Sequence, residues 1–247
     1  IKYNPNDFRA YDAIEGWGRD RDPVESLSMM HEMVNRFHGN VWLLYRLGFQ
    51  YLVAGFPEMA KPYFEQILEL EPDSAFYFYS MSFYEGAKHN REGKYQYKKK
   101  VNERDIKERG IPNDEFLGVC LGAGKYDEAY KVAKIFSELP KPAGAIIINF
   151  GLIQTMGYAF WFGGDTIKAK YYFDLAISHW LEMIKLGRVE KGDNIYLELA
   201  KYYEHKERDI KSALKWANSA RKEAERAELP VYIRKHWLAE IDHRLER

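Results

Sequence analysis

The clearest pattern in the chain is a helical period of apolar residues that recurs in paired stretches. Between residues 41 and 74, two amphipathic stretches are joined by AGFPE, whose glycine and proline interrupt a helix. One face of each stretch is apolar: Leu44, Leu47, Gly48 and Tyr51 in the first, and Ala60, Phe64 and Ile67 in the second. The pattern predicts a helix pair in which the small residues Gly48 and Ala60 let the two backbones approach.

The same spacing returns further along the chain. Twelve residues separate Gly48 from Ala60, and twelve also separate Gly157 from Ala169. Two further copies differ by one residue in the turn: Gly118 with Ala129, and Ala200 with Ala213. Residues 75–110 begin as a helix, but their second half lacks this alternation of small and large residues and forms a degenerate copy.

We therefore expect about six helix pairs, over residues 7–37, 41–72, 75–109, 113–138, 145–186 and 193–227. A last helix from about residue 230 to residue 247 has Ile233, Trp237, Leu238, Ile241 and Leu245 on one face. Its other face is charged, as the terminal cap of a stacked array must be. Pro140 and Pro142 form the strongest internal break and indicate a bend near residues 138–145 within a single domain.

The copy at residues 41–74 resembles the tetratricopeptide repeat, with Leu47-Gly48, Tyr51, Ala60, Phe64 and Pro72 at matching positions. The resemblance implies an all-α fold, a right-handed α-solenoid of about six helix-turn-helix pairs plus a C-terminal capping helix. This array would form one superhelical domain over residues 1–247. The resemblance also implies that the first helix of each pair lines a concave groove that binds peptides or protein surfaces.

Gly48 marks the packed face of its helix, so the residues on the other face are expected to line the groove. In the first copy these are Trp42, Tyr45, Arg46, Phe49, Leu52 and Val53. The next helices offer Phe76, Tyr79, Ser80 and Phe83, and then Gln154, Thr155, Tyr158, Trp161 and Phe162. The last pair offers Leu197, Glu198, Lys201, Glu204 and His205. Aromatic residues bury large areas with few rotatable bonds, so they suit both packing between helices and binding of a ligand, and both roles stay open.

Chaperone-binding members of this family hold a terminal carboxylate with a lysine and asparagines on successive first helices. Tyr45, Arg46 and Phe49 stand at the corresponding places here. This difference favours an internal amphipathic segment or an apolar protein surface as the ligand.

Composition disfavours a nucleic-acid binder that relies on overall charge, because 37 lysines and arginines balance 37 aspartates and glutamates. A local basic patch is the exception: Lys94, Lys98, Lys99 and Lys100, interleaved with two tyrosines. Such a stretch could hold phosphates while its tyrosines stack on bases. The alternative, which we favour, is a solvated face of a long helix whose charges are partly balanced by nearby carboxylates.

Signals for enzymatic chemistry are weak, and we expect neither catalytic residues nor a cofactor. The single cysteine, Cys120, sits in an apolar helix and predicts a buried structural thiol. His236, Glu240 and His243 share one helix face, although the charged surface of a capping helix explains them without a metal. The segment LGAGK, at residues 121–125, is too short for a phosphate-binding loop and fits a turn between helices.

The sequence therefore favours a non-catalytic scaffold that binds a protein segment in an aromatic groove. The alternatives are an accessory or regulatory module of a larger enzyme and a nucleic-acid-binding solenoid. Self-association through Trp17 and Phe8 is a further possibility. The chain begins with Ile1, so we expect a fragment of a longer protein. With no apolar run of about 18 residues we expect no membrane partner, and cytoplasm is only a default location.

Overall fold

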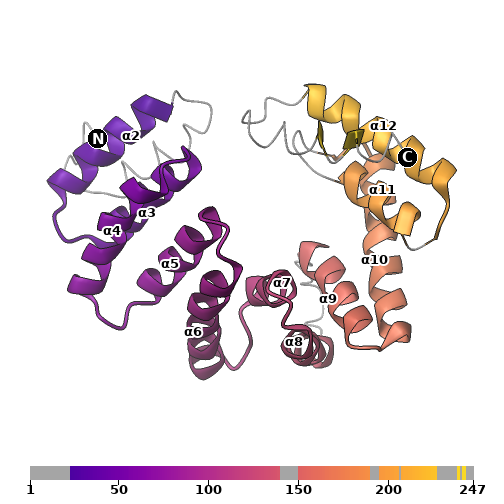
Figure 1. Cartoon of the computed structure of the whole chain (residues 1–247), viewed down its shortest axis with the longest axis horizontal. Coiled ribbons are helices and arrows are strands. Elements are labelled where there is room, and N and C mark those ends of the chain that lie inside the picture. Colours follow the sequence, from indigo (N-terminus) through magenta and orange to yellow (C-terminus); the bar gives the residue numbers. More distant parts are fainter. Residues whose placement is uncertain are drawn as a thin grey trace. The chain divides into compact units, whose positions relative to one another are not determined.

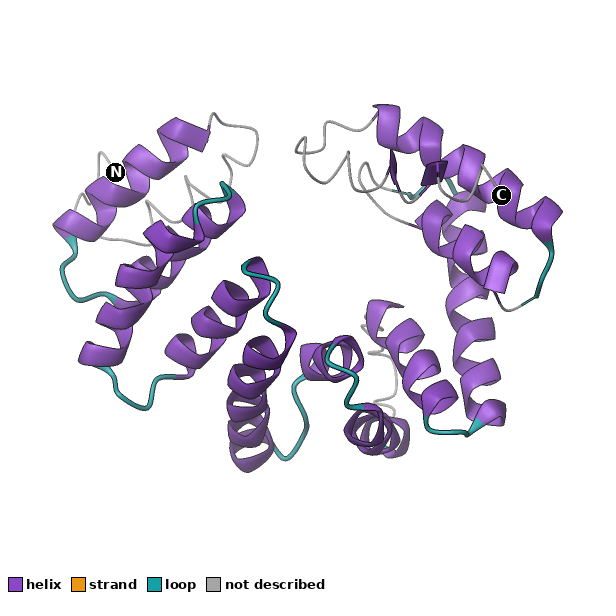
Figure 2. Ribbon diagram, viewed as in Figure 1, coloured by secondary structure: helices purple, strands orange, loops and turns teal. Residues whose placement is uncertain are grey.

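The computed structural model describes residues 23–139, 150–189, 195–205, 207–226, 238–239 and 241–242. In these ranges every regular element is a helix and none is a strand (Figure 1, Figure 2). None of the described helices is long and apolar enough to cross a membrane.

The helices follow the expected pairs closely. They are α2 (Pro23–Arg36), α3 (Val41–Val53), α4 (Pro57–Leu70), α5 (Ala75–Ala87), α6 (Arg91–Arg109), α7 (Asp114–Gly122), α8 (Tyr126–Glu138), α9 (Phe150–Phe162), α10 (Thr166–Lys185), α11 (Ile195–His205) and α12 (Ile210–Arg226). The expected helix before Pro23, the break at Pro140 and Pro142, and most of the helix over residues 230–247 lie outside the described residues.

The chain divides into two compact units, Ile1–Ala169 and Lys170–Arg247. The first unit contains α2 to α9, and the second contains most of α10 together with α11 and α12. The single superhelical domain with a bend near residues 138–145 stays a prediction.

Close helix packing at Gly48 and Ala60 is confirmed in the first unit. Ala60 and Phe64 of α4 are fully buried against α3. A Cβ added to Gly48 would lie 2.2 Å from a ring carbon of Phe64, so only glycine permits this approach. The same core extends to Met81 and Tyr84 of α5, which joins three successive helices around one apolar centre.

The degenerate copy at residues 75–110 also folds as a helix pair, and its small residues lie on the first helix. Ser82 of α5 donates a hydrogen bond of 3.3 Å to the backbone carbonyl of Lys94 on α6. A Cβ added to Gly86, one turn later, would lie 3.2 Å from the Lys94 side chain. Ser82 and Gly86 therefore allow the close approach that Gly48 and Ala60 allow in the preceding pair.

In the second unit, alanines allow α11 and α12 to pack closely. Ala200 and Ala217 are fully buried, and they share a core with Leu197 and Ala220. Ile241, from the expected capping helix, is also fully buried in this core. The copy at Ala200 and Ala213 is thus a helix pair, as the spacing predicts.

Replacing Gly48 with leucine should destabilise the first unit by about 1–3 kcal/mol or more, because the new side chain overlaps the buried Phe64 ring. Thermal unfolding followed by circular dichroism measures this loss. The matched control is Gly122→Ala, because a Cβ at that helical position meets nothing within 4 Å. Alanine there should leave stability unchanged or raise it by about 0.5–1 kcal/mol. Equal melting of Gly48→Leu and the parent would contradict the packing described.

Candidate functional site

Six aromatic side chains predicted to face a groove lie together on α3 and α5. We call this set the aromatic row: Trp42, Tyr45 and Phe49 on α3, and Phe76, Tyr79 and Phe83 on α5. On each helix the three rings are spaced by three and then four residues, so they occupy one helix face. Across the two helices the ring centroids are 5.9 Å apart for Trp42 and Phe76, 6.4 Å for Tyr45 and Tyr79, and 5.3 Å for Phe49 and Phe83.

The rings of the aromatic row pack on one another and are also partly exposed. Phe76 is 39% exposed, and the other five rings are half-buried. The opposite side of α3 supplies the core residues Leu43, Leu44 and Leu47. The packing role is therefore confirmed, because each ring contacts its neighbours. The ligand-binding role stays a prediction, for which each ring keeps part of its surface in solvent.

Three further predicted groove residues, Arg46, Tyr158 and Trp161, lie beside the aromatic row or on another helix. The guanidinium carbon of Arg46 is 5.8 Å from the centroid of the Trp42 ring, so Arg46 flanks the row. Tyr158 and Trp161 lie on α9, and Trp161 is 46% exposed. Two further groove expectations are wrong, because Ser80 and Leu197 are buried.

An ion pair between a buried lysine and a half-exposed glutamate joins the aromatic row to α6 and α7. The side chain of Lys98 on α6 is only 2% exposed, and its Nζ lies 2.5 Å from Oε2 of Glu115 on α7. Tyr79 donates a hydrogen bond of 2.6 Å from its hydroxyl to the other oxygen of Glu115. The Lys98 ammonium also lies 3.6 Å from the centroid of the Tyr79 ring, which is a cation–π contact.

The ion pair shifts the pKa of each of its members. Burial lowers the pKa of Lys98, and Glu115 only partly offsets this effect. Burial alone would raise the pKa of Glu115, but hydrogen bonds from Lys98 and Tyr79 and the lysine charge lower it below its ordinary value. Burial and the bond to Glu115 raise the pKa of Tyr79. At neutral pH, Glu115 is therefore an anion that accepts from both partners.

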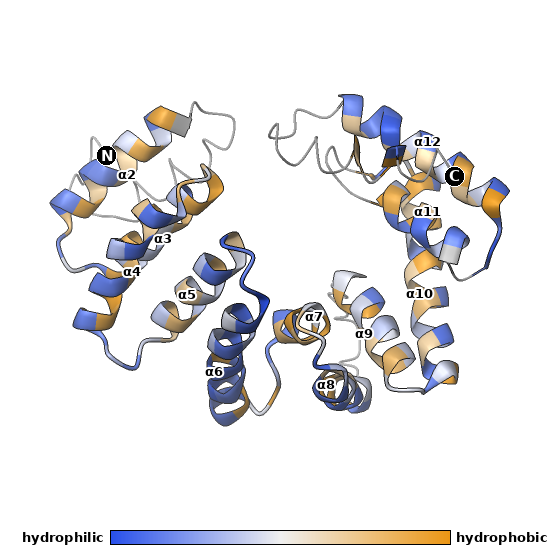
Figure 3. Cartoon of the chain, in the orientation of Figure 1, coloured by the Kyte–Doolittle hydropathy of each residue, from blue (hydrophilic) through white to orange (hydrophobic). Residues whose placement is uncertain are grey.

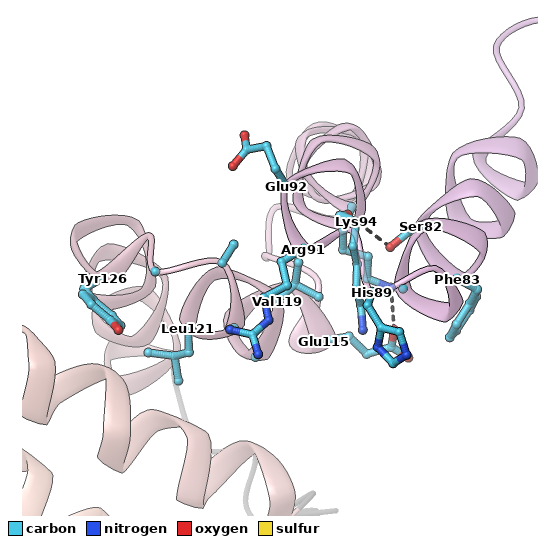
Figure 4. A pocket seen from close by; sticks show the side chains of 16 residues that line it. Ser82, Phe83, His89, Arg91, Glu92, Lys94, Glu115, Val119, Leu121 and Tyr126 are labelled. Carbon is cyan, nitrogen blue, oxygen red and sulfur yellow. Dashed lines mark hydrogen bonds and ion pairs between the residues drawn. The ribbon is translucent and has the colours of Figure 1, made fainter. Parts of the chain in front are cut away.

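A hollow of about 1120 Å³ lies beside this ion pair (Figure 4). Its lining comes from the end of α5, the start of α6, α7 and the start of α8: Ser82, Phe83, Gly86, His89, Arg91, Glu92, Lys94, Lys98, Glu115, Gly118, Val119, Leu121, Gly122, Ala123, Gly124 and Tyr126. Phe83 belongs to both the aromatic row and the hollow. The row and the hollow are therefore continuous.

The interpretation of Lys94, Lys98, Lys99 and Lys100 as a solvated face is wrong for Lys98. Tyr95, Lys98, Val101 and Asn102 follow a helical period, and this face of α6 is buried. Figure 3 shows α6 as hydrophilic over most of its length, so the hydropathy of the sequence does not indicate which face of α6 is buried. Lys99 lies 3.8 Å from Glu128, Lys100 lies over the Phe78 ring, and Lys94 lines the hollow.

The remaining candidates for chemistry are structural where the structure describes them. Cys120 is fully buried, and burial raises the pKa of its thiol to about 12, as expected for a structural thiol. The segment LGAGK forms the turn between α7 and α8, with Gly124 at a φ of +72°. No cluster of three metal-ligating side chains occurs among the described residues. His236, Glu240 and His243 lie outside them.

Removing Glu115 should cost on the order of 3 kcal/mol, because Glu115→Ala leaves the buried Lys98 ammonium without its carboxylate. The double variant Lys98→Met with Glu115→Gln should recover most of this loss, since it removes the buried charge as well. Urea unfolding of the parent, Lys98→Met, Glu115→Gln and the double variant gives the coupling energy. Glu108→Ala, which breaks the exposed pair with Arg104 on α6, is the control and should cost less than about 0.5 kcal/mol.

Glu115 should also make stability depend on acid pH. Its pKa is lowered in the folded chain, so the unfolded chain binds a proton first as pH falls below about 4.5. The stabilisation that the ionised Glu115 provides is complete above pH 4.5, the ordinary pKa of a glutamate. It is lost as pH falls through the lower pKa of Glu115 in the folded chain. Unfolding free energies measured between neutral and acid pH should fall less steeply for Glu115→Gln. A slope identical to that of the parent would contradict the assignment.

Comparison with known proteins identifies the fold. No protein-family model matches the chain, and no curated protein sequence is significantly similar to it. A tetratricopeptide repeat protein from Parabacteroides merdae ATCC 43184 superposes with a TM-score of 0.62 at 16% identity, covering 97% of this chain and 86% of that one. The structure titled MamA RS-1 ArsTM double mutant superposes with a TM-score of 0.51 at 13% identity, covering 74% and 97%. The chain therefore has the all-α, tetratricopeptide-like repeat fold that its spacing predicts.

Proposed function

We propose that this chain is a non-catalytic scaffold that binds a segment of a partner protein along the aromatic row. The observation that carries the proposal is the row itself, six rings from two successive first helices in one continuous array. Large, rigid rings of this kind are frequent anchors of protein interfaces, because they bury much area at a small entropic cost.

The contacts among the rings support binding by a preformed surface. Tyr45 touches Phe49, Phe76 and Tyr79, and Phe83 touches Phe49 and Tyr79. Each ring is held by at least one neighbour, so little side-chain freedom is left to lose when a ligand binds. A preformed surface loses less side-chain entropy on binding, so more of the contact energy contributes to affinity.

The closed ion pair between α6 and α7 supports a scaffold over an enzyme. Both oxygens of Glu115 already accept from Lys98 or Tyr79. The Lys98 ammonium is in turn enclosed by Glu115 and the Tyr79 ring. This cluster of titratable groups is saturated by its own members and acts as a structural connection between helices.

The ligand that best fits the row is an apolar or amphipathic segment of another protein. The exposed parts of the rings offer apolar surface to such a segment. A second copy of this chain is the other source of such a segment, and the experiment below distinguishes it.

Photo-crosslinking tests the proposal directly. Benzoylphenylalanine in place of Phe76, which is 39% exposed in the row, should form an adduct with a short segment of a partner in extract from the source cell. Mass spectrometry maps the segment. The adduct should disappear when Phe49→Ala and Phe83→Ala are added, because they remove neighbouring rings of the same surface.

The matched control places the same crosslinker at Phe56, which is 58% exposed in the turn between α3 and α4 and outside the row. Phe56 should give no adduct with that segment. An adduct with the chain itself would identify a second copy as the occupant. Equal adducts at Phe56 and Phe76, or none at Phe76, would refute binding along the row.

A further inference from the structure

The hollow beside the aromatic row contains carboxylates that are already engaged by cations. Glu115 accepts from Lys98 and Tyr79. Glu92 lies 3.1 Å from the Lys125 ammonium and accepts a hydrogen bond of 2.7 Å from Gln96. Each of these two acidic side chains is therefore already paired with one cation. The lining has three cations, Arg91, Lys94 and Lys98, and only these two carboxylates.

Two cations of the hollow, Arg91 and Lys94, form no ion pair or hydrogen bond through their side chains with any residue that the structure describes. The charge of Lys94 still acts on Glu115, but without direct contact. The two cations lie about one turn apart at the start of α6, where Arg91 is exposed and Lys94 is half-buried. Figure 4 shows Arg91 extending from α6 toward Val119 of α7, into the hollow. The hollow thus carries an excess of positive charge.

Small residues leave the floor of the hollow open. Gly118 and Gly122 of α7 face it, and a Cβ added to Gly122 would meet nothing within 4 Å. At Gly118 the nearest atom to an added Cβ is a Thr155 methyl carbon 3.9 Å away. Room for a bound side chain therefore remains over α7.

The ends of the hollow are aromatic. Phe83, a member of the aromatic row, lies at one end in Figure 4, and Tyr126 lies at the other. Tyr126 is 41% exposed and stacks on Phe162 of α9 with a centroid separation of 4.4 Å. A segment that follows the row past Phe83 therefore meets the two cations before it meets the next exposed ring.

We infer that the hollow binds an aspartate or glutamate side chain of the partner segment whose apolar residues dock on the aromatic row. This inference rests on the proposed function and adds the chemical class of the ligand. The guanidinium of Arg91 can offer two parallel donors to a carboxylate, and Lys94 adds a second positive charge. A carboxylate would neutralise the excess charge of the hollow, whereas a basic segment would be repelled.

Selection from a library of short random peptides displayed on phage tests the ligand class with the full chain as bait. The selected peptides should combine aromatic or aliphatic residues with at least one aspartate or glutamate. The most enriched peptide is then synthesised in two forms, as selected and with its acidic residues changed to the corresponding amides. Fluorescence anisotropy measures the Kd of each form.

Neutralising the two cations should weaken binding of the acidic peptide. The variant Arg91→Gln with Lys94→Gln should raise its Kd by about 10- to 100-fold, which corresponds to about 1.4–2.8 kcal/mol. The same variant should leave the Kd of the amide form nearly unchanged. Lys107→Gln with Arg109→Gln removes equal charge at the far end of α6 and is the matched control.

A second variant fills the hollow without removing charge. Gly122→Leu places a side chain where an added Cβ meets no atom, so the fold should keep its melting temperature. The new side chain should nevertheless exclude the peptide carboxylate and raise the Kd of the acidic form at least tenfold. This variant distinguishes occupation of the hollow from general attraction by positive charge.

The possible results separate this inference from the proposed function. The inference is overturned, and the proposed function is kept, if Tyr45→Ala and Phe83→Ala weaken peptide binding but the selected peptides are not acidic or the hollow variants do not change their Kd. Both proposals fail if no peptide is enriched, or if neither set of variants changes the Kd. Acidic enrichment together with weakened binding in both hollow variants supports the inference.

Discussion

The arrangement of α5, α6 and α7 depends on how one buried charge is compensated. An ammonium group that leaves water loses its hydration, and only a close partner of opposite charge restores much of that energy. Lys98 finds that partner in Glu115 of α7 and a further contact in the ring of Tyr79 of α5. Because Tyr79 also donates to Glu115, a change in the position of any of the three helices would break at least one of these contacts. The ion pair therefore fixes the helix that carries half of the aromatic row.

The aromatic row illustrates how packing and recognition are combined in a thin helical repeat. Each helix of such an array has one face toward its own pair and another toward the neighbouring pairs, so large side chains must fill both. Trp42 and Phe76, or Phe49 and Phe83, fill the space between α3 and α5 while their outer edges remain in solvent. A surface made in this way is rigid without any further support. For the binding that we propose, this rigidity would favour a ligand of complementary shape over adaptation to many ligands.

The fold was predictable because it depends on local spacing, whereas part of the site was not. A helix pair is predicted by the size and spacing of Gly48, Ala60 and Phe64 alone. The helix face predicted from Gly48 also holds for Phe76, Tyr79 and Phe83 on the next first helix. The burial of Lys98 follows from the face that it shares with Tyr95 and Val101, but four lysines within seven residues conceal that face. The hollow is even harder to predict from the sequence, because its cations lie on α6 and its open floor lies on α7. Only the folded arrangement brings Arg91 and Gly122 to the same hollow.

The ion pair of Lys98 and the charge of the hollow are consequences of the same constraint. Glu115 lines the hollow, and Lys94, one helical turn before Lys98, acts on it through its charge but does not contact it. One oxygen of Glu115 accepts from the buried Lys98 ammonium, and the other accepts from the Tyr79 hydroxyl. Lys125 engages Glu92 in a similar way from the turn before α8. The positive charge left on Arg91 and Lys94 is therefore produced by the requirements of the core, and it lies where the aromatic row ends. A change that frees Glu115 from Lys98 would bring a carboxylate to Lys94 and lower the positive charge of the hollow, which would weaken the acidic-ligand binding that we propose.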